Sequence, residues 1–375
     1  MKILVVGAGF SGAVIARELA EAGHKITVID SRDHIAGNAY DYTNEYGIRI
    51  HKYGPHIWHT SNEEAHNWFS QFTEWVPYQH KVLAVLEDGE YVPLPINRHS
   101  INKALKTRFQ TNEEAEAYIE QVREKFVEGS ISNSRQHVEA AVGKQLCDIF
   151  FAPYTKKMWG IPLEELSASV AGRIPTKLND NSLYFPNDKF QAMPEKGYTE
   201  AFNNIFDHPN ITVWLNHPFN YDMENEYDHV FNSTPIDVYF AGVHGELPYR
   251  SIKFNTVTLP GDRILPVGTV NYTTTEKYTR VTEWKNYPAH GTTKKWTTLT
   301  FEEPCDYLEN GKERYYPVKD ANGKFRNIYR MYEREAELLD KVTFIGRCGL
   351  YAYLDMHQSI STALSIVKKF KDKIC

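Results

Sequence analysis

The chain opens with MKILVVGAGFSGAVIARELAEAGHKITVID (residues 1–30), and this stretch decides the fold that we expect. Ile3–Val6 form an apolar run that predicts a buried strand, and a glycine-rich turn follows it directly. The pattern then predicts a helix over about residues 11–22 and a second strand, Lys25–Ile29, that ends at Asp30. Strand, turn, helix and strand in this order indicate an α/β fold with a Rossmann-like parallel sheet.

The glycines of this turn have the spacing by which such units bind a dinucleotide. Gly7 allows the tight turn, Gly9 lets the backbone approach a pyrophosphate, and Gly12 lets the helix pack on the strand. The start of the helix directs free N–H groups and its positive dipole end at the phosphates. Asp30 is the acid that binds a ribose hydroxyl about 20 residues after the glycines. A dinucleotide site is therefore expected, which does not by itself make the protein an oxidoreductase.

The composition is that of an ordinary soluble protein with two or three modules. The chain has 375 residues, of which 42% are hydrophobic and 13% aromatic, enough for sizeable buried cores. A net charge of −6 without a basic run argues against nucleic acid as the main partner. No apolar run approaches the roughly 18–20 residues that span a membrane, and the N-terminus enters a strand without a charged leader. We therefore expect a cytoplasmic protein with no membrane contact.

The cysteines and histidines give no sign of a metal site. The cysteines lie far apart without a C-x-x-C pair, as is typical of reduced thiols: Cys147, Cys305, Cys348 and Cys375. Three histidines stand close together in HKYGPHIWHT (residues 51–60), but no cluster of cysteine or acidic ligands accompanies them. We expect histidines in a loop near a ligand, and no bound metal.

A helical block follows the nucleotide-binding half. Pro93 and Pro95 stiffen a connection, and Ser100 is well placed to cap a helix. Residues 111–129 form an amphipathic pattern, and residues 134–160 repeat apolar side chains at helical spacing, with Pro153 expected to end or kink that helix. The sequence therefore predicts several helices between the two halves.

From about Gly172 the pattern becomes extended and aromatic. Residues 280–288 and 294–304 alternate with period two, which predicts half-buried strands of an antiparallel sheet. The chain ends with a strand, a Gly-Arg turn and a long helix beginning near Asp355, whose core stripe is Ile360, Ala363, Leu364, Val367 and Phe370. In flavoproteins with this nucleotide domain, such a helix points its N-terminus at the N1 and O2 edge of the isoalloxazine and stabilises an anionic reduced flavin. The alternative is a terminal helix that only closes the core.

Eight ordered segments together resemble the UDP-galactopyranose mutase family of bacterial flavoenzymes over nearly the whole chain. Such a series is far more specific than a glycine motif. The segments are GNAYD (37–41), IHKYGPHIWHT (50–60), PYTKKMWG (153–160), RIPTKLNDNSLYF (173–185), GYT (197–199), YTRVTEWK (278–285), RYYPV (314–318) and GRCGLYAYLDMHQSI (346–360).

The resemblance implies three domains and a non-redox use of FAD. The expected limits are a discontinuous FAD-binding domain (1–75, 200–245 and 325–375), a helical domain with a mobile lid (96–171), and an antiparallel sheet domain (76–95, 172–199 and 246–324). The family converts a nucleotide-diphosphate sugar from pyranose to furanose, most often UDP-galactose. N5 of the reduced FAD attacks the anomeric carbon and expels the diphosphate, giving a flavin N5–sugar adduct. The family also suggests a homodimer.

Matching positions supply the expected site residues. On the substrate side, Arg280, Tyr316 and Tyr353 would hold the diphosphate, and Arg173 would lie close to the flavin and sugar. The remaining substrate-side residues would contact the base or sugar or lie on the lid: His59, Phe150, Tyr154, Trp159, Lys177 and Tyr184. The positions that would bind the cofactor are Gly7, Gly9, Phe10, Ser11, Gly12, Asp30, Ser31, Asn38, His56, Arg347, Asp355 and Met356.

This chain departs from the family pattern at four positions. Lys177 stands where a lid arginine is usual and lacks its bidentate fork. Met158 replaces a common glutamine, His80 a common asparagine, and Ala36 one glycine of the usual GGN. An apolar methionine near the ligand would suit a 6-deoxy sugar, so dTDP-fucose is the alternative substrate. Alternatives of other classes are an FAD-dependent oxidoreductase such as an amine oxidase, and a flavin-binding protein without catalysis.

Overall fold

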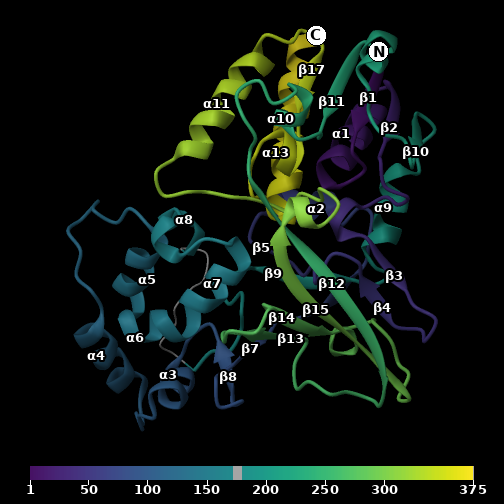
Figure 1. Cartoon of the computed structure of the whole chain (residues 1–375). Coiled ribbons are helices and arrows are strands. Elements are labelled where there is room, and N and C mark those ends of the chain that lie inside the picture. The colour runs from purple at the N-terminus through teal and green to yellow at the C-terminus, as the bar shows by residue number, and fades with distance from the viewer. Residues whose placement is uncertain (172–179, 375) are drawn as a thin grey trace.

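A computed structural model describes residues 1–171 and 180–374, so the predicted site residues Arg173 and Lys177 lie outside the described residues. A parallel sheet of five strands forms the upper part of the molecule, in the order β10-β2-β1-β11-β17 (Figure 1). The strands are β1 (Lys2–Val6), β2 (Lys25–Ile29), β10 (Ile211–Trp214), β11 (His229–Asn232) and β17 (Val342–Phe344). Every neighbouring pair runs parallel, which confirms the predicted Rossmann-like sheet.

Helices from both ends of the chain cover this sheet, and together they make what we call the nucleotide domain. Helix α1 (Phe10–Glu21) packs against α13 (Met356–Ile374) and α9 (Tyr198–Phe206). The predicted stripe of α13 is confirmed, since Ile360, Ala363, Val367 and Phe370 are buried in the same core as α1 and Leu364 packs against it. Three distant parts of the sequence therefore share one core. The other helices are α2 (Glu63–Phe69), α10 (Ile236–Tyr239), α11 (Lys324–Glu337) and α12 (Gly346–Gly349).

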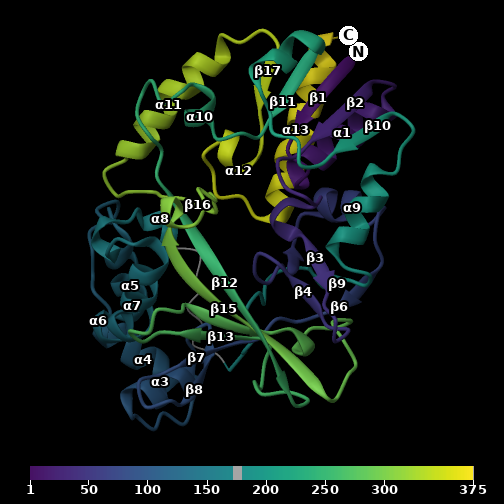
Figure 2. The ribbon, with the colours of Figure 1, turned by 45° about the vertical axis from the view of Figure 1, so that its right-hand side comes forward.

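A second sheet of seven strands lies below the nucleotide domain (Figure 2), in the order β16-β12-β15-β14-β13-β7-β8. Its strands are β7 (Val82–Val85), β8 (Tyr91–Leu94), β12 (Tyr249–Pro260), β13 (Thr269–Tyr272), β14 (Arg280–Glu283), β15 (Trp296–Asp306) and β16 (Tyr316–Pro317). The predicted antiparallel pairing holds except between β7 and β13, which run parallel. The β7–β8 hairpin comes from a much earlier part of the chain and joins the sheet at its edge. Because no tight turn connects β7 to β13, the two strands are free to run parallel.

Two small sheets lie between these layers. One contains β5 (Trp58–Thr60), β9 (Phe190–Pro194) and β6 (Trp75–Pro77), and the other pairs β3 (Asp41–Thr43) with β4 (Arg49–His51). Strand β9 pairs with both β5 and β6, so the chain after the helical block returns to the segment that precedes this block. No helix in the described part of the chain is long and apolar enough to cross a membrane.

The helical lobe differs in detail from the sequence prediction. It contains α3 (Arg98–Leu105), α4 (Asn112–Val122), α5 (Ser134–Val142), α6 (Lys144–Leu146), a π-helical turn (Cys147–Phe151), α7 (Ala152–Trp159) and α8 (Ala168–Ala171). The cap of α3 is Asn97 and not Ser100, because Ser100 occupies the third helical position and completes a capping box. The 134–160 helix is broken at Gly143, whose φ of +79° favours glycine. Pro153 lies in the first turn of α7, where proline is tolerated.

Two basic side chains form hydrogen bonds between helix α7 and the seven-stranded sheet. Lys157 donates from Nζ to the carbonyl oxygens of Tyr272 (2.9 Å) and Tyr278 (2.8 Å). Arg250 on β12 donates to the carbonyl oxygens of Met158 (3.1 Å) and Lys157 (3.3 Å) at the end of the helix. These contacts satisfy carbonyl groups that a helix end and a strand end leave unpaired. They fix the PYTKKMWG segment against the sheet.

Candidate active site

The glycine turn forms one wall of an elongated cavity of about 480 Å³ in the nucleotide domain. Gly7 has a φ of +102°, and a Cβ on Gly12 would lie 1.9 Å from the Gly7 carbonyl oxygen. A Cβ on Gly37 would lie 2.9 Å from the Gly9 Cα atom, so the two backbones can approach this closely only without side chains. The turn therefore has the shape that brings backbone N–H groups to a pyrophosphate.

Asp30 is placed to bind a ribose beside this turn. Its Oδ2 atom accepts from the Ala8 N–H (2.8 Å) and its Oδ1 atom from the Arg32 N–H (2.9 Å). Each carboxylate oxygen can accept a second hydrogen bond, so the side chain is oriented by the backbone and still available to a hydroxyl. The cavity thus fits a dinucleotide. Its walls also include these predicted cofactor residues: Phe10, Ser11, Ser31, Asn38, His56, Arg347 and Met356.

A second cavity of about 160 Å³ meets the first at three residues. His56, Arg347 and Met356 line both, which places the junction where the C-terminal helix α13 begins. Asp355, predicted as a cofactor residue, lines only the second cavity. The predicted substrate residues found on its walls are His59, Tyr154, Tyr184, Arg280, Tyr316 and Tyr353. Residues from distant segments therefore converge in a cavity that adjoins the dinucleotide-shaped one.

Arg280 and Arg347 both bring positive charge to the second cavity, and Arg280 is held by Glu302. Residue pairing between β14 and β15 places the two opposite each other, with 2.7 Å between Arg280 Nε and Glu302 Oε2. Burial alone would lower the pKa of Arg280, but the Glu302 carboxylate raises it well above its ordinary value. The contact with Glu302 is made by Nε, and the Arg280 side chain also lines the cavity. Sequence reasoning missed Glu302, because the adjacent Glu303 carries the same charge and only the pairing with β14 shows which of the two faces Arg280.

Tyrosines surround this arginine. The rings of Tyr316 and Tyr353 are stacked, with centroids 5.1 Å apart and planes 15° apart, and Tyr315 packs edge-on against Tyr316 at 4.6 Å. Burial raises the pKa of Tyr316 well above its ordinary value, so its hydroxyl stays protonated and can donate at neutral pH. Phenol donors and a guanidinium in one cavity are suited to a diphosphate.

Histidines also line this cavity. His59 Nδ1 lies 2.7 Å from Asp188 Oδ2, and its ring stacks on Phe185 with centroids 3.5 Å apart. Burial, with Arg347 and Arg280 nearby, lowers the pKa of His56 to about 4. His80, the departure from the family's asparagine, also lines the cavity, and burial lowers its pKa to about 3. Both rings are therefore neutral at physiological pH, and neither can serve there as a permanent cation.

Two predicted substrate residues lie away from the cavity walls. Phe150 is buried in the core of the helical lobe, within the π-helical turn. Trp159 lies at the end of α7 and faces Tyr316, with ring centroids 6.0 Å apart. No group of three or more histidine, cysteine or acidic side chains that could hold a metal exists among residues 1–171 and 180–374.

A cofactor-binding enzyme is the class that this fold and the two joined cavities define. A family model described as UDP-galactopyranose mutase matches residues 149–353, and one described as an NAD(P)-binding Rossmann-like domain matches residues 5–74. The chain belongs to the UDP-galactopyranose mutase family, whose reaction is an isomerisation. These matches support FAD as the cofactor.

Individual relatives are similar over their full length. A probable UDP-galactopyranose mutase of Klebsiella pneumoniae is 37% identical, with 99% of this chain and 95% of the relative covered. A dTDP-fucopyranose mutase of Escherichia coli is also 37% identical, with 98% of each chain covered. The fold matches a crystal structure of reduced UDP-galactopyranose mutase with a TM-score of 0.80 and 16% identity, covering 99% of this chain and 95% of that one.

Proposed function

We propose that this enzyme interconverts UDP-galactopyranose and UDP-galactofuranose without net oxidation. One observation carries the proposal: Arg280, Tyr316 and Tyr353 share a cavity that meets the cofactor site at His56, Arg347 and Met356. A diphosphate bound to the first three residues would leave the attached sugar facing that junction. When bound and reduced, FAD supplies at N5 the nucleophile that attacks the anomeric carbon.

The protein's own task would be to hold the diphosphate as it leaves and returns. Arg280 donates from its Nη atoms while Glu302 keeps the guanidinium in place through Nε. Tyr316 donates its hydroxyl, and the stacked Tyr353 ring helps to hold the Tyr316 ring in place. Charge-assisted hydrogen bonds of this kind are about twice as strong as neutral ones. The expelled diphosphate would therefore remain close to the sugar until the ring has reclosed.

A second substrate, dTDP-fucopyranose, is favoured by the surroundings of Met158. Met158 packs in an apolar cluster with Trp159, Tyr316 and Tyr353, where the family commonly has a glutamine. Placing a methyl group against such a surface costs less free energy than placing a hydroxyl there, because the hydroxyl would lose its hydrogen bonds to water. The Escherichia coli relative of that name is as similar in identity as the Klebsiella pneumoniae one.

Other features that the family resemblance predicts stay predictions. Arg173 close to the flavin and Lys177 on a lid over the diphosphate lie outside the described residues. The three domain limits, the homodimer, the cytoplasmic location and a role in cell-surface polysaccharide synthesis belong to the same proposal. Sedimentation and cell fractionation would test the assembly and the location.

One assay distinguishes the substrates. Purified protein with bound FAD is reduced with dithionite and given UDP-galactofuranose or dTDP-fucofuranose separately, and the pyranose product is followed by chromatography. We expect fast conversion of UDP-galactofuranose by the reduced enzyme and none by the oxidised enzyme. Faster conversion of the fucose compound would favour the second substrate. Conversion of neither, together with bleaching of the oxidised flavin by an amine, would overturn the proposal in favour of an oxidoreductase.

The matched control is a variant in the loop between β12 and β13 of the same sheet. Arg263→Gln removes an arginine whose only charged contact among the described residues is with the exposed Asp262. We expect this variant to convert the substrate as fast as the unmodified enzyme. Arg280→Gln should lose nearly all conversion while it keeps its FAD.

A further inference from the structure

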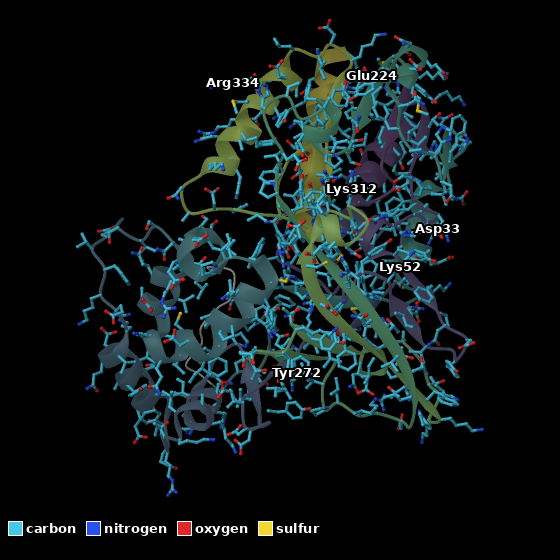
Figure 3. The ribbon with its side chains drawn as sticks, viewed as in Figure 1. Asp33, Lys52, Glu224, Tyr272, Lys312 and Arg334 are labelled. Carbon is cyan, nitrogen blue, oxygen red and sulfur yellow. The ribbon has the colours of Figure 1, made fainter. Side chains whose placement is uncertain are left out.

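A loop of the seven-stranded sheet reaches into the nucleotide domain. The 307–315 loop connects β15 with β16, and Lys312, Glu313 and Arg314 at its tip line the large cofactor cavity. Figure 3 shows Lys312 above the upper ends of β12 and β15, on the side of the nucleotide domain and far from Tyr272. The cavity therefore has one wall that does not belong to the dinucleotide-binding fold.

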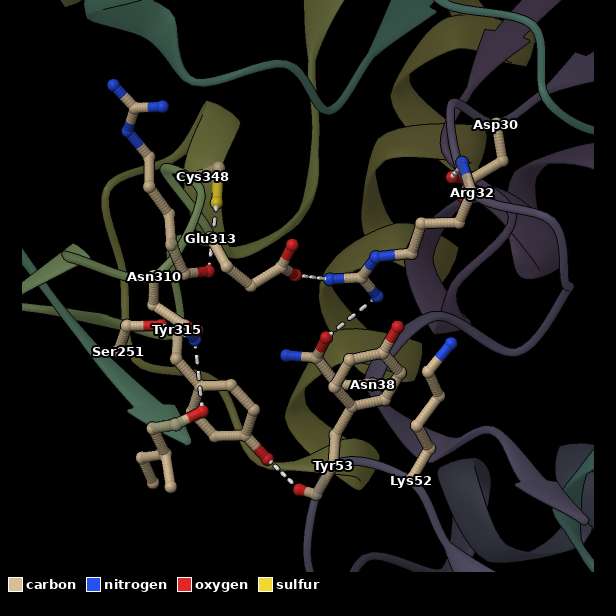
Figure 4. Close-up of polar contacts among 12 residues, drawn as sticks. Asp30, Arg32, Asn38, Lys52, Tyr53, Ser251, Asn310, Glu313, Tyr315 and Cys348 are labelled. Atoms are coloured by element: carbon tan, nitrogen blue, oxygen red, sulfur yellow. Dashed lines mark hydrogen bonds and ion pairs between the residues drawn. The ribbon is translucent and has the colours of Figure 1, made fainter. Parts of the chain in front are cut away.

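An ion pair joins this loop to the glycine-rich side of the cavity. Arg32 Nη2 contacts Glu313 Oε1, and Arg32 Nη1 donates to Asn38 Oδ1 at 3.0 Å. The guanidinium also lies over the Tyr53 ring, with 4.5 Å to the centroid. Figure 4 shows the Glu313 and Arg32 side chains pointing toward each other from opposite walls. Arg32 is 24% exposed and Glu313 35%, so the pair lies at the mouth of the cavity.

The loop is anchored on both sides of Glu313. Asn310 donates from Nδ2 to Ser251 Oγ (2.9 Å), and the Tyr315 hydroxyl donates to the Tyr53 carbonyl oxygen. The Arg314 guanidinium lies over the Tyr307 ring, 4.6 Å from its centroid. Because the residues before and after Glu313 are held by the sheet, its carboxylate has a fixed direction and reaches Arg32 with little loss of side-chain freedom.

The position of Arg32 shows which part of the cofactor the pair would cover. Arg32 is two residues beyond Asp30, the residue placed to bind the adenosine ribose, and its N–H group orients that carboxylate. Asn38, the other partner of Arg32, lies next to Gly37 beside the glycine turn. We propose that the Arg32–Glu313 pair is a clasp across the adenosine half of the cofactor, and that it slows release of FAD. The proposal rests on FAD as the cofactor and not on the identity of the sugar.

The test measures release of FAD from the holoenzyme. Holoenzyme is diluted, and free flavin is separated by ultrafiltration and quantified by visible absorbance over time. Glu313→Gln should speed release about 2- to 5-fold, the range that partly exposed ion pairs provide. Salt at 0.5 M should speed release from the unmodified protein, because it screens the pair, but not from the variant. Glu309→Gln removes the same charge from an exposed position of the same loop and should leave the rate unchanged.

A double-mutant cycle makes the pairing falsifiable. In an Arg32→Gln background, Glu313→Gln should have no further effect, because its partner is already absent. An equal effect of Glu313→Gln in both backgrounds would overturn the clasp, since Glu313 would then act without Arg32. Unchanged or slower release from Glu313→Gln alone would also overturn it. Circular dichroism of each holoenzyme checks that the fold is kept.

Discussion

Replacing Arg280 by lysine tests whether the site needs two separate functions from one side chain. In the structure Nε lies 2.7 Å from Glu302 Oε2, and the same side chain lines the second cavity, so we expect its Nη atoms to bind the diphosphate. A lysine has one ammonium group and cannot hold the fully buried Glu302 and a diphosphate in the same way. Since an unpaired buried carboxylate is very unfavourable, we expect the ammonium to remain with Glu302.

The expected loss follows from the contacts that disappear. One hydrogen bond to a charged group contributes about 1.5–3 kcal/mol, so Arg280→Lys should lower kcat/KM for the nucleotide sugar by roughly 10- to 150-fold. Arg280 does not line the cofactor cavity, so the FAD content should stay at the level of the unmodified protein. The assay is steady-state chromatography with reduced enzyme. A kcat/KM within a factor of two of the original would refute the reasoning, since the Nη atoms would then hold no phosphate.

Three further outcomes are expected. Tyr316→Phe keeps the ring stacking and should reduce kcat/KM about tenfold or more, measured in the same assay, because only the hydroxyl is lost. Ala36→Gly should raise the free energy of unfolding by about 1 kcal/mol in urea titrations, since Ala36 has a φ of +70°, and an unchanged midpoint would contradict this. Burial lowers the pKa of His56 and His290 to about 4 and of His80 to about 3, so the unfolded chain binds more protons below pH 6.5. Thermal stability should therefore fall as the pH falls from 6.5 to 4, and a constant melting temperature there would show that these rings are not buried as described.

Local signals made the nucleotide domain predictable from the sequence. Gly7, Gly9, Gly12 and Asp30 act within one βαβ unit, so their spacing alone defines the geometry that the structure shows. The strand Lys25–Ile29 was predicted with its observed bounds for the same reason. Arg280 and the tyrosines needed the family resemblance, because nothing near them in the sequence tells that they face a shared cavity.

Contacts between distant segments account for what was missed. The contact of Glu302 with Arg280 can be predicted only once the pairing of β14 with β15 is known. The contact of Glu313 with Arg32 likewise depends on where the 307–315 loop lies. The cap of α3 was placed at Ser100 because serine is a common cap, but Asn97 competes for the same role and begins the helix earlier. The two glutamates thus depend on contacts between distant segments, whereas the cap was decided locally between two chemically suitable residues.

The shared core of the nucleotide domain can be completed only after its C-terminal segments have been synthesised. Strand β17 and helix α13 are made after the other parts of this sheet and core, which begin at Lys2, and Arg347 and Met356 line the cofactor cavity. While the ribosome is still making residues 342–374, the face of α1 that α13 covers is open to water. The walls of the cofactor cavity are therefore complete only once residues 342–374 have been made, and until then the growing polypeptide exposes an apolar surface that favours chaperone binding.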